Sequence, residues 1–111
     1  MTTEELRQKK CTACEGTESP LEENEIDTLR GMISPGWSVK EGHHLEREFR
    51  FDDFRQALGF VNKEGQLAEQ ENHHPDIYLA WGRVKITLWS HKIDGLHKND
   101  FILAAKIDEI N

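Results

Sequence analysis

Residues 69–91 read EQENHHPDIYLAWGRVKITLWSH, and this stretch decides the fold that we expect. Its second half alternates apolar and polar side chains with a period of two, which is typical of strands with one buried face. One strand is predicted over residues 77–81 and a second over residues 84–88. Gly82 marks a tight turn between them, so the two strands form an antiparallel hairpin.

A helix is predicted immediately before this hairpin. Apolar residues recur near a 3.6-residue period from residue 52 or 53 to about residue 70, as in an amphipathic helix. Pro75 disfavours helical geometry for His74, so the pair His73-His74 lies on the turn that leaves the helix. The hairpin then brings this turn and His91 to the same end of the sheet.

The remaining elements complete a small α+β domain. A first helix is predicted to begin at residues 19–22, whose sequence SPLE matches a capping box with proline at the first helical position. Two strands follow over residues 37–40 and 45–51, and a last helix runs from about Lys98 to Ile110. The order α-β-β-α-β-β-α, with helices on one face of the strands, predicts a two-layer sandwich.

Composition indicates one globular domain and argues against several classes of protein. The chain has 111 residues, of which 36% are hydrophobic and 32% charged, enough for a single core. A net charge of −7 argues against a nucleic-acid surface, because phosphate binding needs clustered Lys and Arg. No apolar run approaches the ~20 residues of a membrane span. Residues 1–10 lack the apolar segment of a secretory signal, so a cytoplasmic location is expected.

Two cysteines, Cys11 and Cys14, form a C-x-x-C pair in a polar N-terminal stretch. A structural zinc site needs four ligands, and the chain has no second cysteine pair. Nothing before Cys11 indicates the strand that a thioredoxin-like motif would follow. We expect residues 1–18 to form a polar, solvated tail with two free thiols, and residues 19–111 to form the domain. The alternative is a metal site completed by histidines or by a second copy of the chain.

Histidines and carboxylates fall at fixed offsets in the second half of the chain, namely Glu69, His73, His74, His91 and Asp100. Imidazole has an unperturbed pKa of about 6.5, so such a cluster suits a reaction that protonates one atom and deprotonates another. Structural explanations also exist. Asp100 in the first turn of the last helix would interact favourably with the helix dipole, and Glu69 would be an ordinary exposed acid.

The spacing of these residues resembles that of the pterin-4a-carbinolamine dehydratase family, towards its bacterial branch. In the family pattern an acid and three residues precede His-His-Pro, an aromatic residue follows six positions later, a histidine ten after that, and then an aspartate. The matching positions are Glu69, His73, His74, Pro75, Trp81, His91 and Asp100. The resemblance covers about residues 20–111 and implies a four-stranded antiparallel sheet with three helices.

The resemblance also implies an activity. Members of this family are hydro-lyases that dehydrate 4a-hydroxytetrahydrobiopterin, a pterin-4a-carbinolamine, to quinonoid dihydropterin. The reaction recycles the pterin cofactor of an aromatic amino-acid hydroxylase and needs neither a metal nor an organic cofactor. Relatives pair their sheets across a two-fold axis, so a homodimer or homotetramer is expected.

By the same resemblance, His73, His74 and His91 line the pterin pocket. We expect His73 and His91 to act as the acid and the base, in an order that the sequence leaves open, and His74 mainly to bind and orient the substrate. The residues expected to bind or support the substrate are Glu69, Pro75, Trp81 and Asp100.

Two functions of other classes remain as alternatives. One is an interaction module, since animal relatives serve as dimerisation partners of a transcription factor through the surface of the last helix. The other is a metalloprotein that uses His73, His74 and His91 as ligands. The second histidine pair, His43-His44, is expected to be a surface feature of the hairpin at Gly42.

Overall fold

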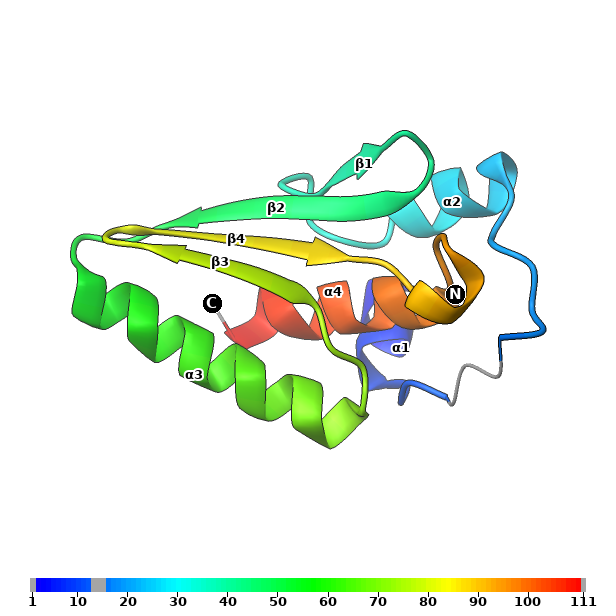
Figure 1. Cartoon of the computed structure of the whole chain (residues 1–111). Coiled ribbons are helices and arrows are strands. Elements are labelled where there is room, and N and C mark those ends of the chain that lie inside the picture. Colours follow the sequence, from blue (N-terminus) through cyan, green and yellow to red (C-terminus); the bar gives the residue numbers. More distant parts are fainter. Residues whose placement is uncertain (1, 13–15, 111) are drawn as a thin grey trace.

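The computed structural model describes residues 2–12 and 16–110. Figure 1 shows a four-stranded sheet with α3 and α4 beneath one of its faces. The elements in chain order are α1 (Thr3–Gln8), α2 (Glu23–Arg30), β1 (Ser38–Lys40), β2 (His44–Arg50), α3 (Phe54–Glu71), β3 (Asp76–Ala80), β4 (Arg83–Leu88), the 3-10 turn η1 (His91–Ile93) and α4 (Lys98–Ile110). No helix within the described ranges is long and apolar enough to cross a membrane.

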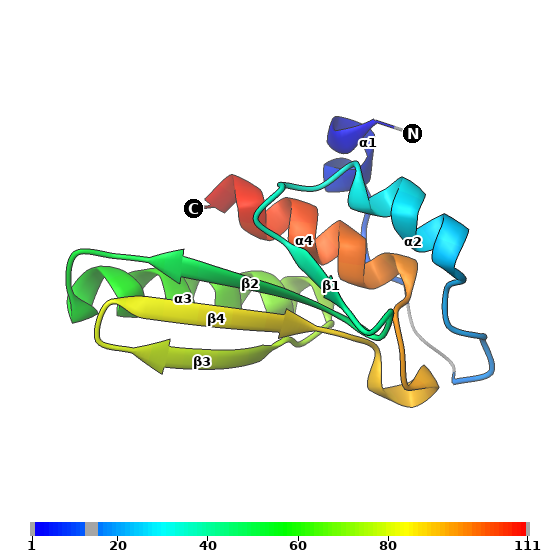
Figure 2. The same cartoon turned by 90° about the horizontal axis from the view of Figure 1, so that it is seen from above.

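The four strands form one antiparallel sheet in the order β1-β2-β4-β3. On one side of β4, Asp76 of β3 pairs with Thr87; on the other side, Leu45 of β2 pairs with Leu88. The first residues of β2 and β3 and the last residues of β4 therefore meet at one end of the sheet. Figure 2 shows α3 passing beneath the sheet, with α1 and α2 beside α4, and α3 packs against β3 and β4. The predicted α+β class and the element order from α2 to α4 are confirmed.

Helix α4 lies at the centre of the core. Phe101, Leu103 and Ile107 are fully buried and share one apolar cluster with Ile86 and Leu88 of β4. Most residues of α4 are buried, so the helix needs cover on several sides, and α1, α2 and α3 each pack against it. The predicted bounds of this helix are confirmed.

The described part of the N-terminal stretch is not solvated as predicted. Residues Thr3–Gln8 form α1, whose Leu6 is fully buried in the main cluster. Arg7 adds an ion pair of 3.0 Å with Glu109 near the end of α4. The physical reason is that α4 has an apolar face beyond the sheet and α3, and α1 covers it. Cys14 lies outside the described residues.

The predicted start of the first long helix is also wrong, by about one turn. Helix α2 begins at Glu23 with Glu22 as its N-cap. The backbone N–H of Leu21 instead donates to the carbonyl of Leu96 at 2.9 Å, which ties the preceding residues to a distant loop. This contact between segments 75 positions apart has no local sequence signal, whereas the capping-box pattern does.

The core contains one buried carboxyl group, that of Glu64, for which no hydrogen-bond partner is found among the described residues. The side chain of Glu64 in α3 is fully buried, and neither carboxylate oxygen has a hydrogen-bond partner among the described residues. Burial raises the pKa of Glu64 from 4.5 to about 7, while the nearby charge of His74 acts in the opposite direction. The carboxyl group is therefore half ionised near neutral pH.

We predict that Glu64 makes the free energy of unfolding depend on pH. The unfolded chain ionises this group at about 4.5 and the folded chain at about 7, so its stabilising contribution is complete below pH 4.5 and is lost by pH 7. Glu64→Gln should therefore stabilise the fold by about 2 kcal/mol more at pH 8 than at pH 5. Urea unfolding of both proteins at the two pH values measures this difference, and an equal effect at both would contradict it.

Candidate active site

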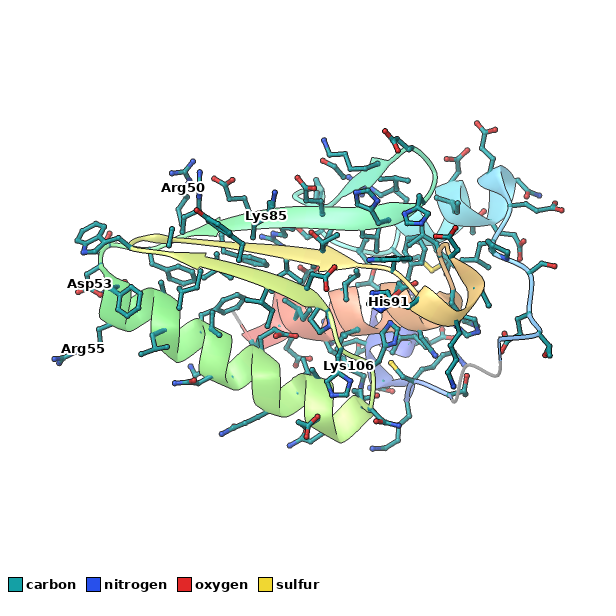
Figure 3. All side chains as sticks on the ribbon, viewed as in Figure 1. Arg50, Asp53, Arg55, Lys85, His91 and Lys106 are labelled. Carbon is teal, nitrogen blue, oxygen red and sulfur yellow. The ribbon has the colours of Figure 1, made fainter. Side chains whose placement is uncertain are left out.

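A pocket of about 320 Å³ lies at the end of the sheet where β3 begins and β4 ends. Figure 3 shows His91 at this end, and Arg50 and Asp53 at the opposite end. The lining residues are Thr12, Asn72, His73, His74, Trp89, Ser90, His91, Lys92 and Asn99. The structure thus brings the three predicted histidines together.

The end of α3 positions the first histidine. Asn72 follows the last helical residue with a φ of 51°, a left-handed conformation that asparagine tolerates better than most residues. The N–H of His73 then donates to the carbonyl of Ala68 at 3.2 Å. Pro75 lies half-buried in the turn into β3 and outside the lining of the pocket.

Behind His73 lies the fully buried carboxylate of Asp100. His73 Nε2 is 2.6 Å from Asp100 Oδ1, the hydroxyl of Ser90 donates to Oδ2 at 3.0 Å, and the backbone N–H of His97 donates to Oδ2 at 2.9 Å. Asp100 also lies in the first turn of α4, where the helix dipole favours negative charge. Asp100 therefore interacts with the start of α4 and contacts His73 at the same time, so the structural role and the site-supporting role expected for it are compatible.

These contacts define the tautomer of His73. An ionised carboxylate only accepts hydrogen bonds, so Nε2 of His73 carries the proton that faces Asp100. In neutral imidazole the other nitrogen, Nδ1, is then an unprotonated acceptor. His73 can therefore take a proton at Nδ1 while Asp100 stabilises the resulting imidazolium.

His74 is held differently. Its Nε2 contacts the Oε2 of Glu69, one turn back on α3, and both side chains are more than half exposed. An exposed pair of this kind contributes little to stability, because water screens it. Glu69 is therefore free to orient His74 at the mouth of the pocket rather than to hold the fold together.

The third histidine, His91, is presented by η1 just after β4. Its ring packs on Trp89 with 4.1 Å between centroids, and His43 of the β1–β2 hairpin packs on the same indole at 4.7 Å. His43 also contacts Asp94 at 2.9 Å. The second histidine pair thus lies in the predicted hairpin but beside the pocket, and the sequence analysis missed this neighbourhood together with Trp89.

Trp81 is not brought to this pocket. It is 68% exposed at the turn between β3 and β4, at the end of the sheet away from His91. The neighbouring Gly82 is required there, because a Cβ atom would lie 2.7 Å from the carbonyl oxygen of Phe51. The aromatic position of the family pattern therefore belongs to the hairpin turn in this chain.

Residues 9–12, which we call the N-terminal strap, reach the pocket through Thr12, which is one of its lining residues. The side-chain amide of Asn99 accepts from the N–H of Thr12 at 2.9 Å and donates to its carbonyl at 2.6 Å. The N–H of Cys11 donates to Oε1 of Glu71 at 2.9 Å. The strap thus contacts Glu71, two residues before His73, and Asn99, the residue before Asp100, and no sequence signal indicated this.

The environment of Cys11 does not favour a reactive thiol. Burial, together with the adjacent Glu71 carboxylate, raises the pKa of the Cys11 thiol to about 12. Within residues 2–12 and 16–110, no three His, Cys, Asp or Glu side chains are arranged to hold a metal ion. The pocket as described contains three imidazoles, of which His73 and His74 have carboxylate partners, and such a set suits proton transfer.

Comparison with known sequences agrees with this geometry. The family model for pterin 4 alpha carbinolamine dehydratase matches residues 19–110. The chain belongs to this family. A protein of Rubrobacter xylanophilus, provisionally named a pterin-4-alpha-carbinolamine dehydratase, is 52% identical over 106 residues, covering 96% of this chain and 98% of that protein. One from Alkaliphilus metalliredigens with the same provisional name is 51% identical and covers 94% of each chain.

A solved structure extends the likeness to three dimensions. The transcriptional coactivator/pterin dehydratase of Brucella melitensis is similar with a TM-score of 0.76 and 32% identity, covering 83% of this chain and 98% of that one. The family match begins after the N-terminal strap, so Thr12, which lines the pocket, lies outside the part of the chain that the family model describes.

We predict that Asp100→Asn switches the tautomer of His73. The new amide can present an N–H to His73 Nε2, which would then have to accept and leave the proton on Nδ1. A neutral amide also replaces the charged carboxylate among these partners, and the loss of charge-assisted hydrogen bonds should lower the free energy of unfolding by about 1–3 kcal/mol. Imidazole ¹⁵N chemical shifts report the tautomer.

Asp53→Asn is the matched control for this change. Asp53 caps α3 at the far end of the sheet by accepting from the N–H of Gln56 at 2.8 Å. Asparagine caps helices about as well as aspartate, so this variant should leave the His73 tautomer and the stability unchanged. An unchanged tautomer in Asp100→Asn would show that Asp100 does not orient His73.

Proposed function

We propose that the protein dehydrates 4a-hydroxytetrahydrobiopterin to quinonoid dihydropterin. The observation that carries the proposal is the convergence of His73, His74 and His91 on one pocket, with His73 held by a buried carboxylate. Membership of the dehydratase family supports the same reaction class. The substrate is what an aromatic amino-acid hydroxylase leaves after using its pterin cofactor, and we infer that the protein serves such a hydroxylase.

The reaction needs an acid that protonates the oxygen on C4a and a base that removes the proton from the ring nitrogen N5. The C4a–O bond breaks as its oxygen receives a proton and leaves as water, and loss of a proton from the neighbouring ring nitrogen N5 allows the C4a=N5 double bond to form. Two imidazoles can fill these roles near pH 7. We assign them to His73 and His91, and we assign His74 with Glu69 to binding and orienting the pterin.

The pocket chemistry favours an enzyme over an interaction module. The proposed interaction surface was the last helix, but α4 is covered by α1, α2 and α3 and is buried along most of its length. The Brucella melitensis protein carries both descriptions in its name, so the fold alone does not distinguish them. We infer that residues 19–111 form the catalytic domain, which the family match over residues 19–110 supports.

The test is a stopped-flow assay in which 4a-hydroxytetrahydrobiopterin is generated in the reaction mixture. Wild-type protein should accelerate its decay, and should do so equally after exhaustive chelation. Removing His73 or His91 by alanine substitution should each lower kcat by about 100- to 10,000-fold. Because the two groups act as one unit, the double variant should be little worse than the poorer single one.

Two further variants sharpen this assignment. His74→Ala should raise KM more than it lowers kcat, and Gln66→Ala, on the exposed part of α3, should change neither. His43 does not serve as a neutral control, because its ring packs on Trp89, which in turn packs on His91. Full turnover by His91→Ala would contradict the assignment, and metal-dependent turnover would favour the metalloprotein.

We also predict a homodimer or larger assembly. Strand β3 is an edge strand, and its Ile77 and Tyr78 are 38% and 52% exposed. Unprotected edges tend to pair with another chain, and charged side chains oppose this. Tyr78→Lys should therefore shift the assembly towards monomer, as measured by light scattering at micromolar concentration. A monomeric wild-type protein would contradict the prediction.

A further inference from the structure

A second cavity, of about 330 Å³, adjoins the histidine pocket across the N-terminal strap. Its lining residues are Lys9, Lys10, Thr12, His97, Lys98, Asn99 and Ile102. Thr12 and Asn99 line both cavities, so the hydrogen-bonded Thr12–Asn99 pair forms their common rim. No residue of this cavity appears in the proposed catalytic roles.

The charge of this second cavity is opposite to that of the whole chain. The protein carries a net charge of −7, yet the described residues that line the cavity include three lysines and no Asp or Glu. Among the described residues, Lys9, Lys10 and Lys98 form no ion pair with a carboxylate. The nearby carboxylate of Glu18 contacts His97 Nε2 at 2.6 Å, so it pairs with that imidazole at the edge. The cavity is therefore a local site for an anion.

The three lysines are carried by anchored backbone. Lys98 is the first residue of α4, and the dipole at this helix end adds partial positive charge. Lys9 and Lys10 lie between buried Leu6 and the strap bonds of Cys11 and Thr12 to Glu71 and Asn99. Their backbone is thus fixed at both ends, while the long side chains can reach a ligand.

The chemistry of pterins relates the two cavities. The side chain of a tetrahydropterin leaves the ring at C6, which is bonded to N5, and N5 is bonded to the reacting C4a. When C4a lies among the histidines, the side chain therefore begins two bonds away and must leave the pocket past its rim. Because Thr12 and Asn99 line both cavities, a side chain that leaves past these two residues reaches the cavity lined by the lysines.

We propose that the lysine cavity is a subsite for a negatively charged pterin side chain, so that the preferred substrate is a 4a-hydroxytetrahydropterin bearing a phosphate or carboxylate group on its C6 substituent. This proposal rests on the proposed dehydratase function and deepens it. The neutral dihydroxypropyl chain of the biopterin form carries no charge for the lysines to bind. An anion instead forms charge-assisted hydrogen bonds with them.

The test compares side chains on one pterin ring. The dehydratase assay is run with the neutral dihydroxypropyl form, with its monophosphate ester, and with a form that ends in glutamate. Wild-type protein should have a KM at least about tenfold lower for a charged form than for the neutral form, and raising the salt concentration should reduce this preference. Preference for the phosphate ester or for the glutamate form identifies which anion the site takes.

The variants Lys98→Gln and Lys9→Gln/Lys10→Gln should raise KM for the charged form towards that of the neutral form. They should leave the neutral form and kcat unchanged. Lys63→Gln, on the exposed part of α3, is the matched control and should change nothing. Equal KM values for neutral and charged forms in the wild type would overturn the proposal, as would variants that weaken both forms equally.

A binding measurement separates this proposal from the proposed activity. Fluorescence titration with the oxidised, non-reacting forms of the same pterins reports the subsite without turnover. If no form is dehydrated but the phosphorylated or glutamylated pterin binds more tightly than the neutral one, and Lys98→Gln removes the difference, the activity fails and the subsite stands. Equal binding of charged and neutral pterins overturns the subsite whatever the activity.

Discussion

The buried carboxylate of Asp100 is the constraint on which the rest of the site depends. A carboxylate without water is costly unless donors surround it, and here three donors come from separate parts of the chain. His73 comes from the turn after α3, Ser90 from the segment between β4 and η1, and the N–H of His97 from the residue before α4. The hydrogen bonds that compensate the charge of Asp100 therefore also fix the imidazole of His73. Movement of one of these segments would weaken both the stabilisation of the carboxylate and the orientation of the ring.

Glu64 shows how a buried carboxyl group behaves when no hydrogen-bond donor from the described residues contacts it. Both carboxylates are fully buried, but Glu64 has no hydrogen-bond partner within the described residues, and its pKa is raised to about 7. The difference lies in the surroundings rather than in burial. Asp100 lies at a helix start, where backbone N–H groups are free, whereas Glu64 lies within α3, where they are already used.

Periodicity and turn chemistry predicted the elements that carry the histidines. The hairpin around Gly82 and the helix from Lys98 to Ile110 have strong local signals, and an antiparallel hairpin necessarily returns His91 to the level of His73. Contacts between distant segments have no such signal. The strand order that places His43 against Trp89, and the burial of Leu6 under α4, follow from tertiary packing, which a single sequence does not display.

The aromatic residue of the family pattern, Trp81, shows that regular spacing along the chain does not by itself place a residue in the pocket. Its spacing to Pro75 and His91 is regular along the chain, but a hairpin places the middle of such a segment at the far end of the sheet. Trp81 therefore lies at the turn, while Trp89, which the spacing did not single out, packs against His91. Regular spacing predicts proximity within a strand pair only for residues opposite each other, such as Asp76 and Thr87.

The N-terminal strap connects the segment that carries His73 with the segment that carries Asp100. It binds Glu71, two residues before His73, and Asn99, the residue before Asp100. A segment that binds both neighbours restrains the separation of the histidine from its carboxylate, which neither contact alone would do. Leu6 anchors the strap to α4 by burial, so stability of the core and alignment of the pocket are coupled through residues that lie outside the family-matched region.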